Sequence, residues 1–371
     1  MPAASAEYYI GLMSGTSIDA IDAVLVAFEA DRPRIVASHS TPVSAALKNA
    51  ILELCLPGKD HLDLLGDTDR AIGEHFAATA LTLLNKAGLP PAHINAIGSH
   101  GQTVRHRPYD KRPFTLQIGD PNTIAALTGI VTVADFRRKD VALGGQGAPL
   151  VPAFHRAAFH HPRHNRLVMN IGGIGNITWL PTSGSVTGFD TGPGNGLMDA
   201  WIQRHRSQPY DNEGAWAASG HCHSELLQRL LQHPFLARRG PRSTGREEFN
   251  LRWLDTVLAD FLPLPPEDVQ ATLAHFTART LAATTADLPG NPEEILVCGG
   301  GAHNTLLMTL LGNLLAPRPV VSTAASGIDP GLVEGAAFAW LARQALLRQP
   351  GSLASVTGAS RDAVLGAIYF P

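Results

Sequence analysis

Near the start of the chain the sequence reads Gly11-Leu12-Met13-Ser14-Gly15-Thr16-Ser17-Ile18-Asp19. This stretch joins two short apolar runs, Tyr8–Met13 and Ile21–Phe28, which are rich in residues that favour β-strands. A strand hairpin with a glycine and three hydroxyl side chains at its tip can offer backbone N–H groups and hydroxyls to an anion. The stretch therefore predicts an anion-binding hairpin.

Three further glycine-rich turns follow strand-like runs, at Asn170–Thr178, Asp190–Gly196 and Gly299–Asn304. Several phosphate-type turns in one chain predict a nucleotide held between two related halves. The sequence contains neither G-x-x-x-x-G-K-[ST] nor G-x-G-x-x-G, so neither a P-loop nor a Rossmann dinucleotide site is expected. If ATP binds, hairpin amides and Mg²⁺ would hold its phosphates.

Composition limits the class of protein. A chain of 371 residues is long for a single core, so two domains are expected. With 44% hydrophobic and 16% charged residues, the chain fits a globular enzyme better than a disordered or fibrous protein. The net charge is −3 and no long basic run occurs, which argues against a nucleic-acid partner.

The three cysteines, Cys55, Cys222 and Cys298, are odd in number and widely spaced, so no disulfide framework is expected. The N-terminal residues lack the basic start and apolar core of a signal peptide. No apolar run approaches the roughly 18 residues of a membrane helix. These features predict a cytoplasmic protein without a membrane partner.

Strand and helix patterns alternate along the chain, and each half opens with a strand, a glycine turn and a strand. Leu62–Ala87 reads as a long amphipathic helix that Gly88 ends. The pattern restarts at Leu167–Ile171. Charges and glycines interrupt it near Phe136–Gly147, which predicts a border between domains 1–136 and 137–371.

Asp190 follows the apolar run Val186–Phe189 and precedes a glycine-rich turn. Two interpretations stay open from this pattern. The carboxylate could act as a general base in a cleft at the strand end, or it could only cap the turn. The following residues, 191–195, are expected to form a turn whose amides face an anion at the start of a helix.

Other polar residues also follow strand-like runs. Ser99, His100 and Gln102 suit the polar wall of a sugar site, although a lone histidine is more often structural. Arg137 could pair with an anionic ligand or form a salt bridge at the domain border. Glu334 opens a helix, which favours a structural role with a weaker claim on the active site.

The sequence leaves the metal ligands unknown. One of Asp19 and Asp22 could hold Mg²⁺ through water, or both could be plain hairpin residues. Four histidines lie between residues 155 and 164, but Pro162 interrupts any helical register among them and no cysteine is near. We therefore expect a solvated loop there rather than a metal site.

The sequence resembles a known family. The turns at Gly11–Asp19, Asn170–Thr178 and Gly299–Asn304 look like the phosphate and adenosine loops of the acetate and sugar kinase/Hsp70/actin superfamily. Six motifs sharpen the resemblance to the anhydro-N-acetylmuramic acid kinases; they are Gly98–Val104, Gln117–Asp120, Asp135–Arg137, Gly144–Leu150, Asp190–Asn195 and Ser243–Glu247. They span almost the whole chain in the family's order. Departures are mild, at Ile18, Ala20 and Arg242.

The resemblance implies an α/β, two-domain actin-like ATPase (ribonuclease H-like) fold with a central cleft. Residues 1–136 would carry the first phosphate loop and part of the sugar site. Residues 137–371 would carry the second phosphate loop, the catalytic aspartate and the adenosine loop. ATP and Mg²⁺ are the implied cofactors, and a homodimer is the implied assembly.

The resemblance also implies residue roles. Asp190 would be the catalytic base. The implied ATP phosphate contacts are Ser14, Gly15, Thr16, Ser17, Asp19, Gly172, Gly173 and Asn176. The implied adenosine contacts are Gly299, Gly300, Gly301 and Asn304. The implied sugar contacts are Ser99, His100, Gln102, Asp120 and Arg137.

The implied reaction opens 1,6-anhydro-N-acetylmuramic acid with water and phosphorylates it from ATP, giving N-acetylmuramic acid 6-phosphate and ADP in peptidoglycan recycling. Two alternatives stay open. One is a kinase for another sugar or a short carboxylate, in which Asp190 would deprotonate a substrate hydroxyl. The other is a non-enzymatic sugar sensor on the same fold.

Overall fold

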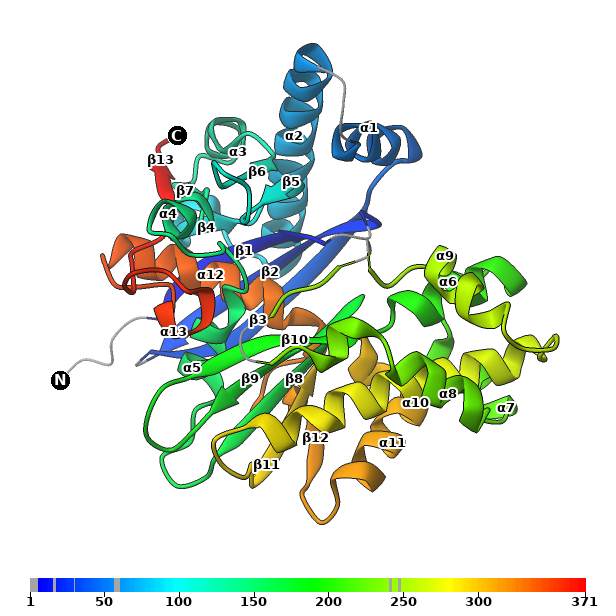
Figure 1. The fold of residues 1–371 in the computed structure, drawn as a ribbon. Helices are drawn as coiled ribbons and strands as arrows, with labels where there is room; N and C mark the ends of the chain where they lie inside the picture. The colour runs from blue at the N-terminus through cyan, green and yellow to red at the C-terminus, as the bar shows by residue number, and fades with distance from the viewer. Residues whose placement is uncertain (1–5, 16–17, 30, 57–60, 240–241, 246–247) are drawn as a thin grey trace. The chain divides into compact units, whose positions relative to one another are not determined.

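The structure is a computed structural model that describes residues 6–15, 18–29, 31–56, 61–239, 242–245 and 248–371. The chain divides into two compact units. The first unit contains Met1–Ala158 and Leu332–Pro371, and the second contains Phe159–Gly331. Figure 1 shows the helices and strands of both, coloured along the chain.

The first unit is built on a sheet with the strand order β13-β7-β4-β1-β2-β3. Its strands are β1 (Glu7–Ser14), β2 (Ala20–Glu29), β3 (Arg32–Pro42), β4 (Ile94–Ser99), β7 (Thr132–Ala134) and β13 (Ala367–Tyr369). The first three form an antiparallel meander, β4 runs parallel to β1, and β7 runs parallel to β4. The final strand, β13, adds antiparallel to β7.

Helices and a separate hairpin complete the first unit. They are α1 (Ala45–Cys55), α2 (Leu62–Ala87), α3 (Pro121–Thr128), α4 (Arg138–Ala142), α12 (Val333–Leu346), α13 (Ala354–Thr357), and the hairpin of β5 (Gln102–Arg107) and β6 (Phe114–Ile118). Helix α2 has the bounds that the sequence predicts. It ends because Gly88 adopts a left-handed conformation and donates its N–H to the last helical carbonyls.

Two glycines let α12 approach the sheet of the first unit closely. A Cβ atom at Gly11 of β1 would collide with the carbonyl oxygen of Gly335, and one at Gly98 of β4 with that of Phe338. Both obstacles are backbone atoms, so they cannot rotate away. The two central strands that lead to the predicted hairpin tip and to His100 are thus fixed against one helix.

The second unit repeats the same plan, with the strand order β10-β9-β8-β11-β12. Its strands are β8 (Arg166–Ile171), β9 (Ile174–Leu180), β10 (Thr187–Pro193), β11 (Glu294–Cys298) and β12 (Val320–Ser322). The first three are again an antiparallel meander, and β11 and β12 continue the sheet in parallel. The two α/β units share the same strand order. This confirms the predicted actin-like fold with two related halves.

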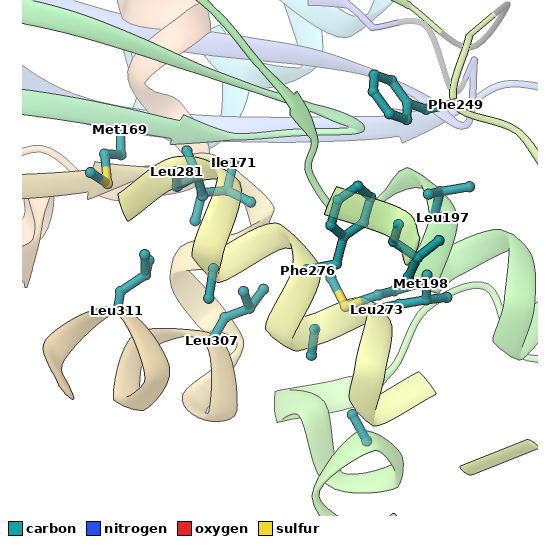
Figure 2. Close-up of a cluster of buried hydrophobic side chains, with 14 of the residues drawn as sticks. Met169, Ile171, Leu197, Met198, Phe249, Leu273, Phe276, Leu281, Leu307 and Leu311 are labelled. Atoms are coloured by element: carbon teal, nitrogen blue, oxygen red, sulfur yellow. The ribbon is translucent and has the colours of Figure 1, made fainter. Parts of the chain in front are cut away.

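Helices bury the core of the second unit. They include α6 (Gly196–Arg206), α7 (Ala215–Ser219), α8 (Ser224–Leu231), α9 (Leu251–Leu258), α10 (Pro266–Ala283) and α11 (Thr305–Leu315). Figure 2 shows Leu273, Phe276 and Leu281 of α10 among the side chains of this core. Because α10 is buried along most of its length, it fixes the helices and strands around it as one body.

The division of the chain differs from the border expected at residues 136 and 137. The first unit continues through Ala158, and the C-terminal segment Leu332–Pro371 returns to it. Helix α5 (Val151–Phe159) bridges the border. The charged and glycine-rich stretch at Phe136–Gly147 lies inside the first unit, where buried Asp140 accepts hydrogen bonds from the Gly147 N–H and the Thr357 hydroxyl at 2.7 Å each.

Within the described part of the chain, no helix is both long enough and apolar enough to span a membrane.

Candidate active site

In the first unit, the hairpin tip begins at Ser14, the last residue of β1. Its buried hydroxyl donates to Oε1 of Gln102 at 2.7 Å. A Cβ atom added at Gly15 would meet nothing within 4 Å, so the backbone there borders open space. Thr16 and Ser17 lie outside the described residues. The structure thus links Ser14, a predicted phosphate contact, to Gln102, a predicted sugar contact.

Asp19 lies beyond the hairpin tip and pairs with Lys48 of α1, with 2.6 Å between Oδ1 and Nζ. The carboxylate is 69% exposed, so the pair is a solvent-screened one and stabilises the fold little. The backbone carbonyl of Asp19 accepts from the Val43 N–H at 2.9 Å. Asp19 is therefore bonded to α1 and to the residue that follows β3.

Buried His100 and half-buried Arg137 form a pair in the first unit. Nη2 and Nε of Arg137 lie 2.9 and 3.3 Å from Nε2 of His100. Burial and the charge of Arg137 lower the pKa of His100 to about 3, so the ring is neutral at physiological pH. A guanidinium can only donate hydrogen bonds, so Nε2 must accept and the ring proton must sit on Nδ1.

Arg137 is held by several groups besides His100. Its Nη1 donates to the Gly147 carbonyl at 2.7 Å. Burial lowers its pKa to about 10, while the charges of Glu334 and Asp140 oppose that shift. All of these partners belong to the first unit. The position of Arg137 therefore does not require a salt bridge at the expected domain border. Glu334, which the sequence assigned mainly to helix capping, is a charge partner of Arg137.

Asp120 serves as the N-cap of α3. Its carboxylate accepts from the backbone N–H groups of Asn122 and Thr123, each at 3.0 Å, and from both of their side chains. Burial raises its pKa, but these hydrogen bonds outweigh burial and the net pKa lies below the ordinary value. The cap engages both oxygens, so Asp120 positions the start of α3 next to Gly119.

In the second unit, the β8–β9 hairpin turns at Gly172 and Gly173. The carbonyl oxygens of these glycines accept from the N–H groups of residues 194–196 at 2.7–3.1 Å. A Cβ atom at Gly194 would collide with the Gly172 carbonyl. The sequence-based expectation that the amides of residues 191–195 face an anion is wrong for Gly194 and Asn195, because those amides bind the neighbouring turn. A Cβ at Gly173 would meet nothing within 4 Å.

Asp190 lies inside β10 rather than at its end. The strand runs on to Pro193, with a bulge between Asp190 and Gly192. The bulge places an extra residue opposite β9, which bends the strand and redirects nearby side chains. The sequence after Asp190 therefore resembles the end of a strand, although the strand continues to Pro193.

The Asp190 carboxylate is half-buried, and its Oδ2 accepts from the Thr244 N–H at 3.0 Å. The backbone of Asp190 is held from both directions by Arg242. The Asp190 N–H donates to the Arg242 carbonyl and Nε of Arg242 donates to the Asp190 carbonyl, each at 3.0 Å. Arg242 also stacks on Phe189, with 4.7 Å from its guanidinium carbon to the ring centroid. The segment around Thr244 therefore orients the carboxylate.

A row of polar residues crosses the sheet of the second unit. Asn170 of β8 is paired with Asn176 of β9, which is paired with Asp190 of β10. Directly paired residues project to the same face of a sheet. The row joins the predicted phosphate-binding residue Asn176 to the predicted base. Asn170 lies inside a quoted motif but was not among the predicted site residues.

The glycine-rich segment after β11 also lies next to the β8–β9 hairpin. Gly299 has a φ of 78°, and a Cβ there would lie 2.5 Å from Oδ1 of Asn170. This left-handed, crowded position favours glycine. Gly301 packs equally closely on Ile171. Asn304 caps α11 by accepting from the Leu307 N–H at 3.0 Å. The structure thus gathers three predicted loops of the second unit at one edge of its sheet.

Among the described residues, no group of three or more His, Cys, Asp or Glu side chains is placed to hold a metal ion. The histidine-rich stretch is not a solvated loop throughout, because His155 lies in α5 and is only 1% exposed. Burial lowers the pKa of His155 to about 3. The other three histidines lie beyond the helix.

The comparisons with known proteins match nearly the whole chain. The sequence profile of a family described as anhydro-N-acetylmuramic acid kinase matches residues 7–371. A protein of that name from Shewanella pealeana is 54% identical over 363 residues, covering 98% of each sequence. Another from Shewanella loihica is 52% identical over 366 residues, covering 98% of this chain and 99% of the relative.

Likeness to solved structures is weaker. A ROK family glucokinase from Streptomyces griseus, solved in complex with glucose and AMPPNP, aligns with a TM-score of 0.40 and 13% identity. The alignment covers 91% of this chain and 99% of that one. So loose a likeness adds nothing to the family match or to the strand order.

Proposed function

The chain belongs to the anhydro-N-acetylmuramic acid kinase family, and we propose that it hydrolytically opens 1,6-anhydro-N-acetylmuramic acid and phosphorylates it from ATP. The products would be N-acetylmuramic acid 6-phosphate and ADP, and the process served would be peptidoglycan recycling. The family match over residues 7–371 supports the reaction. The observation that carries the mechanism is Asp190, a half-buried carboxylate oriented by the Thr244 N–H at 3.0 Å.

We assign the general base to Asp190. It takes a proton from a water molecule as the water oxygen attacks the anomeric carbon of the sugar. The bond between that carbon and the bridging 6-oxygen breaks, and the 6-oxygen attacks the γ-phosphorus in line, releasing ADP.

We assign the phosphates of ATP to the two hairpin tips and the adenosine to the segment after β11. Gly15 and Gly173 border open space, which suits backbone approach to a phosphate. Asn176 supplies a side-chain donor near the second tip. Ser14, whose hydroxyl proton is donated to Gln102, stays a proposed contact together with Asp19, Thr16, Ser17 and Gly172. Gly299, Gly300, Gly301 and Asn304 remain the proposed adenosine contacts.

We assign the sugar to the first unit, at the carboxyl ends of β4 and β7. Ser99, His100 and Arg137 form the centre of this wall, and Gln102 links it to Ser14 of the hairpin. The half-buried Arg137 is suited to a carboxylate such as the lactyl group of the substrate. Asp120 acts indirectly, by positioning the start of α3, because its carboxylate caps that helix.

Mg²⁺ is part of the proposal because it neutralises phosphate charge in reactions of this class. The ion needs only one or two carboxylates besides phosphate oxygens, so a site made wholly of protein ligands is not required. Asp19 and Asp22 flank the first hairpin tip and supply the hard oxygen ligands that the ion prefers. Asp19 would have to share its charge with Lys48.

We also propose the cytoplasm as the compartment, since ATP is available there and Cys55, Cys222 and Cys298 are all free thiols. A homodimer stays a prediction.

The proposed function is tested by product analysis with 1,6-anhydro-N-acetylmuramic acid and ATP. We expect a sugar product that has gained one phosphoryl group and one water, with one ADP formed per product. Without ATP the anhydro ring should stay closed. Phosphorylation of an ordinary hexose or of acetate, with the anhydro-sugar unchanged, would favour the alternative kinase. Sugar binding without any ADP formation would favour a sensor.

A further inference from the structure

Asp190 belongs to a closed cycle of hydrogen bonds within the second unit. Its Oδ2 accepts from the Thr244 N–H at 3.0 Å, and the Thr244 hydroxyl donates to Oε2 of Glu248 at 2.7 Å. The other oxygen of Glu248, Oε1, accepts from Nη2 of Arg238 at 2.7 Å. Nη1 of Arg242 donates to the Arg238 carbonyl, and Nε of Arg242 donates to the Asp190 carbonyl at 3.0 Å. The cycle starts and ends at the proposed base, so each member restricts the next.

Two phenylalanines hold the arginines of this cycle. The guanidinium carbon of Arg238 lies 5.1 Å from the ring centroid of Phe235, which is fully buried. The guanidinium carbon of Arg242 lies 4.7 Å from the Phe189 centroid and 5.7 Å from that of Phe235. A cation over an aromatic face is attracted to it. The arginine side of the cycle is therefore anchored on the core of the second unit.

Glu248 joins this anchored side to Thr244, because each of its two carboxylate oxygens accepts one of the hydrogen bonds. Its side chain is 27% exposed and that of Arg238 is 49% exposed, so solvent screens their ion pair and the pair stabilises the fold little. The bond from the Thr244 hydroxyl is short and charge-assisted, and such bonds constrain geometry strongly. Glu248 therefore acts mainly on where the Thr244 backbone lies.

The position of the Thr244 N–H matters for the ionisation of Asp190. A hydrogen bond donated to a carboxylate favours the ionised form and lowers the pKa of the carboxyl group. A general base has to be ionised before it can take a proton from water. A displaced Thr244 would thus leave Asp190 both less well oriented and more readily protonated.

Other charges surround the cycle. Burial lowers the pKa of Arg242, the charges of Asp287 and Asp190 oppose that shift, and the charge of Arg239 adds to it. His233 lies within the electrostatic reach of Glu248 and Arg238. The variants proposed below leave all of these side chains except Glu248 in place.

We propose that Glu248 is a positioning residue for the base Asp190, because it holds Thr244 where the Thr244 N–H keeps the carboxylate ionised and directed at the attacking water. Arg238 holds Glu248 in turn. The inference rests on the proposed function for the role of Asp190, and it adds a residue that makes no contact with Asp190 among the hydrogen bonds given above.

The first test compares Glu248→Leu with Glu248→Gln in steady-state kinetics across pH, with 1,6-anhydro-N-acetylmuramic acid and ATP. Leucine removes both acceptor oxygens, whereas glutamine keeps one. We expect Glu248→Leu to lower kcat about 10-fold with little change in either KM. The acid limb of the kcat profile, where the base becomes protonated, should move to higher pH by about one unit. Glu248→Gln should retain most of the activity.

The direction of the pH shift separates positioning from electrostatics. Removing a negative charge near another carboxylate lowers the pKa of that carboxyl group, so the acid limb would move to lower pH. Loss of the hydrogen bond from Thr244 moves the limb to higher pH. A merely structural role of Glu248 would lower the midpoint of urea unfolding and leave the limb where it is.

Thr244→Val is an independent way to break the same link, since it removes the hydroxyl and keeps the backbone N–H. If Thr244 and Glu248 act through one bond, the double variant should be no slower than either single variant. Asp255→Leu is the matched control, because it removes an ion pair of 2.5 Å with Arg204 elsewhere in the second unit. It should leave kcat and the acid limb unchanged. Fully additive losses, an unmoved limb or a shift to lower pH would each overturn the inference.

Failure of this inference and failure of the proposed function can be told apart by a readout without turnover. The Asp190 carboxyl group is titrated by ¹³C NMR on the full chain without substrates, and Asp190→Asn identifies its signal. Turnover of the anhydro-sugar, with an Asp190 pKa that Glu248→Leu does not raise, would contradict the role of Glu248 alone. No turnover, with an Asp190 pKa that Glu248→Leu does raise, would contradict the proposed function and leave the positioning of the carboxylate supported.

Discussion

Replacing Asp190 with asparagine is expected to lower kcat by at least about 10²-fold, the scale of a lost general base. Asparagine has nearly the same shape, and its side-chain oxygen can still accept from the Thr244 N–H that holds Asp190 at 3.0 Å. The hydrogen bonds between Arg242 and the backbone of Asp190 do not involve the Asp190 side chain. The fold and ATP binding should therefore survive, and steady-state kinetics with calorimetry of ATP binding separate the two effects.

A matched control for this substitution is Asp260→Asn in the same unit. Asp260 is 60% exposed and lies 3.6 Å from Arg229, an ion pair that contributes little to stability. The control should keep normal turnover. A folded Asp190→Asn enzyme with near-normal kcat would show that Asp190 only caps the β10 bulge.

Gly11→Ala is expected to destabilise the chain by about 3 kcal/mol or more. The added methyl group would collide with the Gly335 carbonyl, a backbone atom of α12, so β1 and the helix must separate. Overpacking a tight interface usually costs about 1–3 kcal/mol, and a backbone obstacle puts this position at the upper end. Urea unfolding should show a lower midpoint, and the displaced β1 should weaken ATP binding as well.

Gly66→Ala provides the opposite control within the first unit. Gly66 is an exposed residue of α2, and a Cβ there would meet nothing within 4 Å. Alanine should stabilise the helix by up to about 1 kcal/mol, because glycine is the poorer helix former. If Gly11→Ala were as stable as wild type, the close approach of α12 to β1 would not hold the first unit together.

Much of the fold could be predicted because local patterns were strong. The α2 helix has both an apolar stripe and a glycine stop, and its predicted bounds agree with the structure. The glycine hairpins of both halves were also predicted. The domain border was not, because the return of Leu332–Pro371 to the first unit is a long-range event that no local pattern encodes. The continuation of β10 to Pro193 was not predicted either, because the glycine-rich sequence after Asp190 resembles a turn.

The candidate site could be predicted residue by residue but not contact by contact. The sequence predicted Ser99, His100 and Arg137 as site residues. The tautomer of His100 and the packing of the three residues, however, depend on segments far apart in sequence. The role of Glu334 near Arg137 requires α12 to pack on the first unit. Motif spacing indicates chemistry, whereas tertiary packing decides which atoms meet.

The measurement that tests the coupled mechanism most directly is turnover in ¹⁸O-labelled water. If Asp190 activates water against the anomeric carbon, the label should appear at the anomeric oxygen and be absent from the transferred phosphoryl group. The bridging oxygen of the anhydro ring should become the phosphate-ester oxygen. Label in the phosphoryl group would mean that water attacks phosphorus, and the assignment of Asp190 as the base for ring opening would be wrong.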